Sequence, residues 1–499
     1  MERYDLLVVG GGINGAGIAR EAAGRGLSVA LVEQDDLGAH TSSASSKLVH
    51  GGLRYLERCE FRLVAEALAE REVLARAAPH LVRPMRFVMP HAPGLRPAWM
   101  IRAGLFLYDY LARRATLPGS ESVALRASPY GAGLKPQYER GFVYSDCRVD
   151  DARLVIATAR SAAEHGAVIL PRTQCLSARR ANGEWRVRLR ACGGMTAEVA
   201  ARAIANATGP WARSFLTGTL GERASFGLRL VKGSHIMVPR LFEGEHAYIL
   251  QNDDRRVVFV CPYEERYTLI GTTEVELDAP PRRCTASPEE VRYLCRAAGR
   301  YFAHPPSERD VVWSYCGVRP LFDDGRADPS AVTRDYVLRV DGGPRQAPVL
   351  SVFGGKITTY RRLAEQALER LARWFPGMRG PWTGTVPLPG GELDGMRFED
   401  FAEVRLKRDF PWLAPELRRA LAARHGALAY EVLAGAASAA DLGEHYGAGL
   451  HAREVDYFVE REWARTSEDV LWRRTKAALH LAPEEREAVA RRLARQLSG

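Results

Sequence analysis

The stretch DLLVVGGGINGAGIAREAAGRGLSV, residues Asp5–Val29, decides the fold of the first part of this chain. An apolar run over Leu6–Val9 predicts a buried strand, and the residues after the glycines have the composition of a helix. Between strand and helix stand the three glycines of a GxGxxG pattern, Gly10, Gly12 and Gly15. Glycines in such a turn let the backbone approach a pyrophosphate at the helix N-terminus, so the stretch predicts a dinucleotide site.

A second apolar run, Ser28–Val32, ends in Glu33, where a carboxylate can accept hydrogen bonds from a ribose diol. The alternative is a tight turn in another kind of parallel sheet, with Glu33 merely solvated. The pattern does not choose between NAD and FAD, because both contain the same adenosine diphosphate half. Two later segments, IANATGPW (Ile204–Trp211) and SVFGGKITTYR (Ser351–Arg361), are predicted to return to the same sheet, which suits a long cofactor.

The composition predicts a globular protein of two or three domains, since 499 residues exceed one ordinary core. The net charge of +10 suits an anionic partner, but the basic residues are interleaved with acidic ones, so we expect no nucleic-acid binding. The eight cysteines show no CxxC pair and no zinc spacing, which predicts no disulfide framework, no metal site and a reducing cytosol. The N-terminus has the pattern of a strand and no apolar run could span a bilayer, so we expect any membrane contact to be peripheral.

Four short segments place cations or histidines beside glycines, which is unusual for core strands. They are VHGGLRY with His50 and Arg54, VKGSHIMV with His235, CGVRPLF with Arg319, and FGGKITTY with Lys356. A buried cation needs an anion nearby: a protein carboxylate would make these residues structural ion pairs, whereas a ligand would make two or three of them a phosphate clamp. The histidines are either satisfied core residues or the general base of an alcohol oxidation.

In these segments and in others, the chain closely resembles the FAD-dependent aerobic glycerol-3-phosphate dehydrogenases, a branch of the D-amino-acid-oxidase-like flavoproteins. Beyond the opening stretch, the matching segments include TSSASSKLVHGGLRYLE, YSDCRVDDARLV, KGSHIMVP, GVRPL, SVFGGKITTYRRLAE and DVLWRRTK. The resemblance runs from near residue 5 to near residue 480 and is weakest over 116–138, 279–288 and 392–437.

The resemblance implies FAD as the cofactor, and with it an α/β fold class. The expected architecture is a Rossmann-like FAD-binding domain with an inserted mixed-sheet substrate domain, followed by an all-α C-terminal domain beyond the break VPLPGG. The predicted boundaries are 1–80, 145–215 and 330–380 for the FAD-binding domain, 81–144 and 216–329 for the substrate domain, and 381–499 for the helical domain.

The resemblance also implies the site residues. Those expected to bind FAD are Gly10, Gly12, Asn14, Gly15, Glu33, Thr41, Ser42, Ser45, Ser46, Thr208, Gly209, Gly354, Gly355, Lys356 and Thr358. Those expected to line the substrate pocket are Arg54, Tyr55, His235, Thr272, Arg319 and Lys356, with His50 near the isoalloxazine. The catalytic candidates are His235, His50, Arg319 and Lys356, and His235 is slightly favoured over His50 as the base. Gly51 and Gly52 are expected to let the backbone pass close to the flavin ring.

The implied reaction moves a hydride from C2 of glycerol 3-phosphate to the flavin N5, gives dihydroxyacetone phosphate, and then reduces ubiquinone or menaquinone. It implies a cytoplasmic protein at the inner face of the cell membrane, held by peripheral contact. The segment PAWMIRAGLFLYDYLARR (Pro97–Arg114) is the candidate membrane-facing helix, and a buried helix between domains is the alternative. The oligomeric state is left open, with a homodimer among the alternatives.

Three other functions stay open at this point. The first is a glycerol-3-phosphate oxidase that uses oxygen in place of quinone. The second is an amine, amino-acid or hydroxy-acid oxidase of the same fold, which would need a cation for a carboxylate but no cluster of cations. The third is a basic nucleotide-binding scaffold without catalytic activity.

Overall fold

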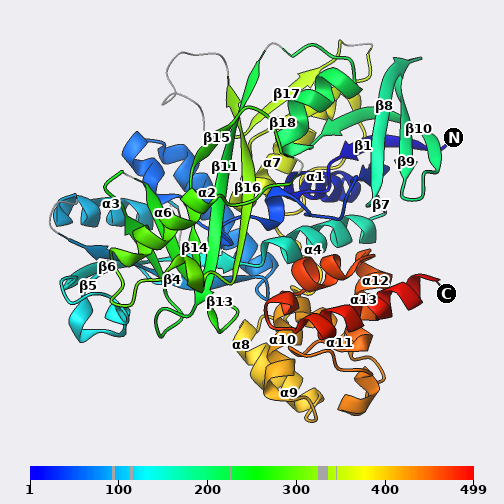
Figure 1. Cartoon of the computed structure of the whole chain (residues 1–499). Coiled ribbons are helices and arrows are strands. Elements are labelled where there is room, and N and C mark those ends of the chain that lie inside the picture. The colour runs from blue at the N-terminus through cyan, green and yellow to red at the C-terminus, as the bar shows by residue number, and fades with distance from the viewer. Residues whose placement is uncertain are drawn as a thin grey trace.

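The computed structural model describes residues 1–92, 96–112, 116–224, 226–254, 256–281, 283–323, 335–343 and 346–498. Two β-sheets and a group of helices near the C-terminus make up this part of the chain (Figure 1). Two residues of the predicted membrane-facing helix, Arg113 and Arg114, lie outside the described residues.

The first sheet is built around the opening stretch of the sequence. Its strand order is β17-β18-β10-β1-β2-β7, parallel from β18 to β7, with the hairpin β8-β9 paired to β10. A parallel sheet in this position is what the Rossmann-like prediction requires, and the prediction is confirmed. The elements are β1 (Arg3–Val9), α1 (Ile13–Gly24), β2 (Val29–Val32), α4 (Asp151–Glu164), β7 (Val168–Leu170), β8 (Thr173–Ala181), β9 (Glu184–Ala191), β10 (Thr196–Asn206), β17 (Val337–Asp341), β18 (Val349–Phe353) and α7 (Tyr360–Leu371).

Strand β1 is apolar at successive positions because both of its faces are covered. Leu6 and Val8 belong to a core shared with α1, α4 and α7. Leu7 and Val9 belong to a second core on the opposite face, which includes Trp185 of the β8-β9 hairpin. A parallel strand buried on both faces needs a continuous apolar run and not an alternating one.

The turn between β1 and α1 requires its glycines. Gly10 has a φ of +112°, a backbone conformation that side chains with a Cβ rarely adopt. A Cβ on Gly15 would lie 1.8 Å from the carbonyl oxygen of Gly10, so only glycine lets α1 pack this closely on the end of β1. The predicted strand, turn and helix are therefore confirmed, with the N-terminus of α1 aimed at the end of the sheet.

The second sheet is larger and mixed. Its order is β15-β11-β14-β13-β12-β4-β6-β3, with β16 paired to β11 and β5 paired to β6. Strands β4 and β12 are parallel, whereas β11 and β16 pair antiparallel from Gly227 with Asp323 to Met237 with Trp313. The strands are β3 (Leu48–Val49), β4 (Val82–His91), β5 (Glu121–Ala124), β6 (Arg140–Val149), β11 (Gly227–Pro239), β12 (Ala247–Gln251), β13 (Val257–Tyr263), β14 (Tyr267–Gly271), β15 (Val275–Leu277) and β16 (Trp313–Asp323).

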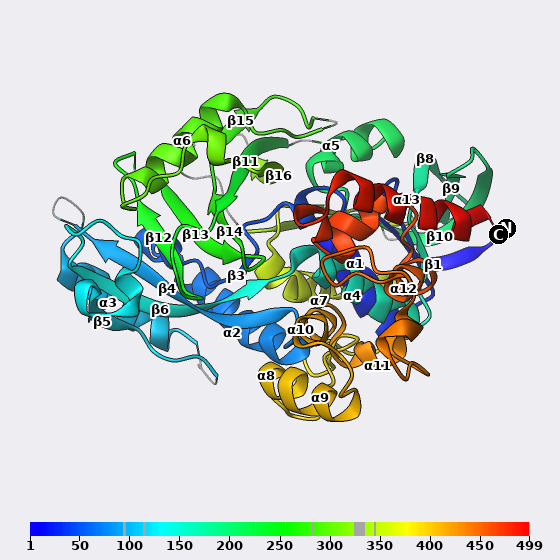
Figure 2. The ribbon, with the colours of Figure 1, turned by 60° about the horizontal axis from the view of Figure 1, so that its bottom comes forward.

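The mixed sheet confirms the expected fold class, and the two sheets lie side by side in Figure 2. Strand β6 runs through residue 145, where the sequence places a domain boundary, and the boundaries themselves stay predictions. Three helices accompany this sheet: α2 (Phe61–Ala77), α3 (Ala98–Tyr110) and α6 (Pro288–Gly299). None of the helices in the described ranges combines the length and the apolar character needed to cross a bilayer.

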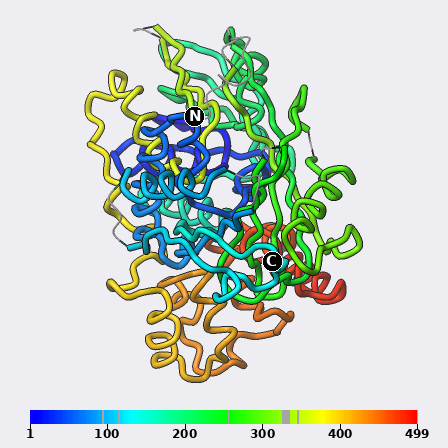
Figure 3. Tube along the Cα trace, turned by 90° about the vertical axis from the view of Figure 1, so that its left-hand side faces the viewer, coloured from blue at the N-terminus to red at the C-terminus, as the bar shows by residue number. Residues whose placement is uncertain are grey.

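The C-terminal part is helical, as predicted, and has a core of its own with Leu421 and Phe458 at its centre. Its principal helices are α10 (Pro415–His425), α12 (Ala452–Glu462) and α13 (Pro483–Ser498). Figure 3 shows this part, coloured orange to red, gathered at one end of the molecule. Helix α12 and the segment Asp469–Arg474 pack against α4, which covers one face of the first sheet, so the helical domain lies against that part of the protein.

A disulfide joins two of the cysteines. Cys284, in the loop before α6, is bonded to Cys316 on β16, with the two Cα atoms 5.6 Å apart. The cysteine spacing indicated no disulfide framework and gave no sign of this one bond. The two residues are 32 positions apart and carry no spacing signal, so only the folding of the loop onto β16 brings them together.

Candidate active site

A cavity of about 740 Å³ runs between the two sheets, from Glu33 and His40 at one end to Tyr55 and Arg319 at the other. Most of the predicted site residues lie on its wall: Gly10, Gly12, Asn14, Glu33, Thr41, Ser42, Ser45, Ser46, His50, Tyr55, Thr208, Gly209, His235, Thr272, Arg319, Gly354, Gly355, Lys356 and Thr358. The tertiary structure therefore brings together side chains from segments that are hundreds of residues apart.

Two predicted site residues do not lie on this wall. Gly15 serves the packing of α1 on β1, as its contact with Gly10 shows. Arg54 belongs to a 3₁₀-helix over Leu53–Arg58, in which residues three apart share a face, so Tyr55 and Arg58 line the cavity and Arg54 does not. Arg58 lies on the wall beside Tyr55, and the role of Arg54 at the substrate end stays a prediction.

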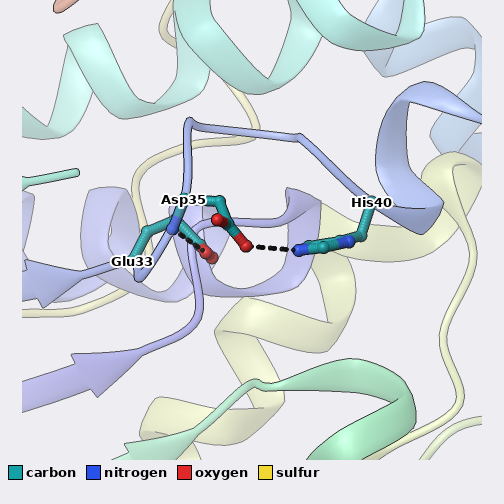
Figure 4. Close-up of side chains that lie close together, drawn as sticks. All are labelled: Glu33, Asp35 and His40. Atoms are coloured by element: carbon teal, nitrogen blue, oxygen red, sulfur yellow. Dashed lines mark hydrogen bonds and ion pairs between the residues drawn. The ribbon is translucent and has the colours of Figure 1, made fainter. Parts of the chain in front are cut away.

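The end of the cavity near β2 is organised by Glu33 (Figure 4). Its carboxylate accepts hydrogen bonds from the backbone amides of Gly11, at 2.7 Å, and Asp35, at 2.9 Å. The side chain is buried, and burial raises the pKa of Glu33 although both amides act to lower it. Each carboxylate oxygen keeps a second lone pair, which fits the predicted acceptance of ribose hydroxyls at the end of the second strand.

Glu33, Asp35 and His40 together bring three atoms able to bind a metal within 4.8 Å of one another. Two of them are already engaged with each other: Asp35 lies 2.8 Å from His40 Nε2, and this contact is the main cause that raises the pKa of His40 (Figure 4). Since Glu33 accepts two backbone amides as well, the cluster is explained by hydrogen bonding within the loop.

The middle of the cavity is formed by the glycine turn and the segment after β18. Asn14 donates from Nδ2 to the carbonyl of Gly354 at 3.1 Å, and a Cβ on Gly355 would lie 2.6 Å from the same nitrogen. The Oδ1 atom of Asn14 is buried and has no hydrogen-bond partner among the described residues. The first turn of α1 contains no acidic residue, so its positive N-terminal end is left for an anion.

The end of the cavity near the mixed sheet gathers cations. Lys356 Nζ lies 4.0 Å from the ring centroid of Tyr55, a cation–π distance, and this buried atom has no hydrogen-bond partner in the described part of the chain. Arg319 is half-exposed, donates to the carbonyl of Thr273 at 3.2 Å and approaches Glu274 at 3.7 Å. Arg319 thus has a carboxylate partner that could make it a structural ion pair, whereas Lys356 Nζ has no hydrogen-bond partner among the described residues.

His235, on β11, is buried against the substrate side of the cavity. Its ring stacks on Tyr315 with centroids 4.9 Å apart, and its Nε2 lies 2.9 Å from Ser46 Oγ. Burial, with smaller contributions from Lys47 and Arg319, lowers the pKa of His235 to about 3. The ring is therefore neutral near pH 7, and its Nδ1 has no hydrogen-bond partner among the described residues.

His50 is held differently. Its Nδ1 accepts a hydrogen bond from the amide of Gly52 at 3.1 Å, so the neutral ring carries its proton on Nε2. Burial lowers the pKa of His50, which keeps the ring neutral. A ring in this tautomer donates from Nε2 and cannot accept a proton there, which favours His235 as the base.

The glycines after His50 lie where the chain packs closely. A Cβ on Gly51 would lie 2.5 Å from Leu68 Cδ2, and the Gly51 amide donates to Tyr108 Oη at 2.8 Å. Gly52 has a φ of +74°, and a Cβ there would meet the ring of Tyr55. The two glycines are required by the close packing of α2, α3 and Tyr55, and the expectation that they also let the backbone pass close to a flavin ring stays a prediction.

Comparison with known proteins identifies the family. The model of the FAD dependent oxidoreductases matches residues 5–361 of this chain. The chain belongs to that family. A second model, the C-terminal domain of alpha-glycerophosphate oxidase, matches residues 382–498, which correspond to the helical domain. The resemblance drawn from the sequence motifs is thereby confirmed.

This flavoprotein has close relatives over its whole length. It is 53% identical over 484 residues to a glycerol-3-phosphate dehydrogenase of Pseudomonas aeruginosa, which covers 97% of this chain and 94% of the relative. It is 52% identical over 490 residues to a D-erythritol 1-phosphate dehydrogenase of Brucella abortus, with coverage of 98% and 97%. The crystal structure of a glycerol-3-phosphate dehydrogenase from Bacillus halodurans complexed with FAD matches with a TM-score of 0.77 at 28% identity, covering 99% of this chain and 91% of that one.

FAD is therefore the cofactor of this oxidoreductase, and the residues of the cavity fit it. The N-terminus of α1 offers a site for the pyrophosphate, and Glu33 stands at the end of β2 where the ribose binds in such folds. The buried, unpartnered Oδ1 of Asn14 lies between these elements and the segment after β18. Buried polar atoms are rarely left without a partner, so this atom also points to a ligand.

Sequence reasoning missed an ion pair that supports the site. Lys47, buried and with a φ of +57°, lies 2.7 Å from Asp151 at the start of α4. The Asp151 carboxylate also accepts a hydrogen bond from Ser45 Oγ at 2.8 Å. The ion pair therefore fixes the backbone on both sides of Ser46, the residue that contacts His235. Lys47 and Asp151 are 104 residues apart, and no local pattern in the sequence connects them.

Proposed function

We propose that the protein oxidises sn-glycerol 3-phosphate to dihydroxyacetone phosphate, with FAD as the acceptor of the hydride from C2. The observation that carries this proposal is the buried ammonium of Lys356, which has Tyr55 beside it and no hydrogen-bond partner in the described chain. A buried cation without a carboxylate partner requires an anion from elsewhere. Lys356 and Arg319 both line the cavity, and two cations bind a phosphate dianion more strongly than one cation does.

In this proposal FAD, when bound, supplies the hydride acceptor. Protein side chains bind the phosphate, orient the substrate and take up the hydroxyl proton. Lys356 and Arg319 hold the phosphate and thereby orient C2 of the substrate. His235, neutral near pH 7, takes the hydroxyl proton on Nδ1 while Nε2–H donates to Ser46 Oγ. Because the charge of Arg319 is one cause that lowers the pKa of His235, a phosphate bound to Arg319 raises the proton affinity of the ring when the substrate is present.

His50 has a positioning role in this scheme. His50 lines the cavity, its Nδ1 accepts from the amide of Gly52, and its proton is therefore on Nε2. A donor held in this way can fix the orientation of a cofactor or substrate oxygen, but it has no lone pair to take up a proton.

A second candidate substrate is a four-carbon polyol phosphate such as D-erythritol 1-phosphate. The relative of that name is nearly as similar to this chain as the glycerol-3-phosphate dehydrogenase is. Beyond Arg319, the cavity wall carries the polar side chains of Arg229, Glu274 and Glu276, which could bind additional hydroxyl groups. The phosphate clamp and the base would serve both substrates in the same way.

For the second half-reaction, we propose that a membrane quinone, ubiquinone or menaquinone, takes the electrons, and that the protein rests on the inner face of the cytoplasmic membrane. Helix α3 supports this part of the proposal. Ile101, Leu105 and Tyr108 are buried, and the opposite side exposes Trp99, Met100, Phe106, Leu107 and Tyr110. An amphipathic helix with aromatic residues on its exposed side is typical of interfacial membrane contact. The alternative of a helix buried between domains is wrong, because Trp99 is 71% exposed.

Anaerobic bleaching of the flavin tests the proposal directly. Addition of glycerol 3-phosphate to the oxygen-free protein should reduce the bound FAD and abolish its visible absorbance, and plain glycerol and amino acids should not. D-erythritol 1-phosphate in the same assay decides between the two polyol phosphates. Faster bleaching by amino acids than by either phosphate would refute the proposal, and oxygen consumption with and without a quinone analogue separates an oxidase from a quinone-linked enzyme.

A further inference from the structure

The C-terminal domain contacts the loop after β2 through a buried cluster of charges. Asp36, which is 1% exposed, lies 2.6 Å from Arg473 Nε and 2.9 Å from Arg474 Nη2. Arg474 is itself completely buried, and Arg473 is 8% exposed. Both arginines belong to the segment Asp469–Arg474, within the part of the chain that matches the C-terminal domain model.

The carboxylates of this cluster account for the charge of both arginines. Arg473 also pairs with Asp469, at 2.5 Å, and Asp469 in turn pairs with Arg172 at 2.7 Å. Arg474 donates a further hydrogen bond to the carbonyl of Glu462. Removing one partner of a buried ion pair leaves an uncompensated buried charge, which is strongly unfavourable, so the cluster holds Asp36 in one position.

Asp36 lies within the loop that organises the adenosine end of the cavity. Glu33 precedes it by three residues and His40 follows it, and both line the cavity, whereas Asp36 does not. The loop is also supported by the buried side chain of Leu37 and by backbone contacts: the Gly38 amide donates to Gly11 at 3.0 Å, and the Arg172 amide donates to Asp35 at 2.8 Å. The loop has no regular secondary structure between β2 and Thr41, so its shape depends on such contacts from outside.

The helical domain has no direct access to the cofactor. Within the described part of the chain, the cavity wall ends at Thr358, and none of its residues belongs to the segment matched by the C-terminal model. Any influence of that domain on FAD must therefore pass through another residue, and Asp36 is the point of contact nearest in sequence to Glu33.

We propose that Arg473 and Arg474 are positioning residues for FAD: by holding Asp36, they keep the loop from Glu33 to His40 in the shape that receives the adenosine ribose. The inference rests on FAD as the cofactor and not on the identity of the substrate. It assigns to the C-terminal domain a share in cofactor affinity, although none of the described residues of that domain lines the cavity.

Flavin binding to the full-length chain, after removal of its FAD, tests the proposal. Three ligands are compared: FAD, ADP as the adenosine half, measured by competition, and FMN, which lacks that half. In Asp36→Asn and in Arg474→Gln we expect the Kd of FAD and of ADP to rise at least tenfold and the Kd of FMN to change less than twofold. The turnover number at saturating FAD should stay within twofold of the unaltered protein.

General loss of structure would give a different pattern, because it would weaken FMN and FAD binding in parallel. A parallel loss, or FAD affinity within twofold of the unaltered protein in both variants, would overturn the proposal. Should Arg474→Gln fail to fold, Arg474→Lys decides, since lysine keeps the charge but cannot form the two-pronged contact with Asp36. We expect that variant to lose several-fold in FAD affinity.

Two matched controls lie in the same domain. Arg418 is a buried arginine paired with Glu403 at 2.6 Å, away from the loop, so Arg418→Gln should lower thermal stability and leave the Kd of FAD within twofold. Trp472, the neighbour of Arg473, stacks on Trp313 of the mixed sheet with ring centroids 4.2 Å apart. Trp472→Leu should likewise leave the Kd of FAD within twofold. None of these titrations contains a polyol phosphate, so the inference can fail or stand independently of the proposed substrate.

Discussion

Lys356 Nζ lies 4.0 Å above the ring of Tyr55, buried at the wall of the cavity, with no hydrogen-bond partner among the described residues. The ring provides only the weak attraction of its π face, worth about 0.5 to 2 kcal/mol. That is too little to offset the burial of an ammonium, which normally requires a carboxylate or a bound anion. The arrangement is that of a site prepared for an anionic ligand.

Replacement of Lys356 by glutamine should therefore weaken substrate binding. Loss of a charge-assisted hydrogen bond costs about 1.5 to 3 kcal/mol, which corresponds to a rise of about 10- to 100-fold in KM for glycerol 3-phosphate. Steady-state kinetics with a soluble dye as acceptor measure the change. Lys407→Gln, at an exposed position of the helical domain, is the control and should leave KM unaltered. Equal KM values in the two variants would assign Lys356 to structure.

Arg319→Ala should also raise KM, and Glu274→Gln should act in the opposite direction. Glu274 lies 3.7 Å from Arg319 and competes with a phosphate for its charge. We expect a rise of about 10-fold or more for the alanine variant and a fall of about two- to threefold for the glutamine variant. A rise of KM in Glu274→Gln would show that this carboxylate positions Arg319 and does not compete for it.

Acidification should destabilise the protein in part through His235. Burial first, and then Lys47 and Arg319, lower the pKa of this ring from 6.5 to about 3. Between these two pKa values the unfolded chain binds a proton at this ring and the folded protein does not. The contribution of the neutral ring to the free energy of unfolding is therefore complete above about pH 6.5 and is lost as the pH falls toward about 3. At about pH 4.5 the loss is roughly 2 to 3 kcal/mol.

Urea unfolding of the unaltered protein and of His235→Gln, at about pH 7 and about pH 4.5, measures this contribution. The variant should lose less stability on acidification than the unaltered protein. His304→Gln, at an exposed position, is the control and should lose as much as the unaltered protein does. An equal loss in His235→Gln would mean that other groups carry the acid sensitivity.

Polar residues on the exposed side of α3 should detach the protein from lipid. Trp99 and Phe106 are 71% and 57% exposed, and we expect Trp99→Ser with Phe106→Ser to lower binding to anionic lipid vesicles by about tenfold or more. The rate with a membrane quinone should fall, and the rate with a soluble dye should not. Val404→Ser, 65% exposed on the helical domain, serves as the control. Unchanged vesicle binding in the α3 variant would place the membrane contact elsewhere.

The nucleotide-binding end could be predicted in detail because its determinants are local. Gly10 and Gly15 contact each other, and Leu6–Val9 is apolar because one strand is covered on both faces. The substrate end could be predicted only as a set of residue types, since sequence motifs name side chains without giving their directions. Gly51 shows the difference: the sequence indicates a close approach at this glycine, but only the structure shows that Leu68 packs against it.

The longest connections could not be predicted. Asp36 and Arg474 are 438 positions apart, and Cys284 joins Cys316 without any spacing signal. Pairs of this kind depend on how whole domains pack, and a single sequence contains no periodicity that reports it.

By itself the sequence determined the strand, glycine turn and helix of the first sheet, the kinds of side chain that meet in the cavity, and the family to which the chain belongs. Only the tertiary structure decided that Arg58 joins Tyr55 on the cavity wall, that His50 carries its proton on Nε2, and that the helical domain reaches the cofactor loop through Asp36. The physical reason is that secondary structure follows from neighbouring residues, whereas side-chain direction, tautomer and buried charge pairing follow from contacts between distant parts of the chain.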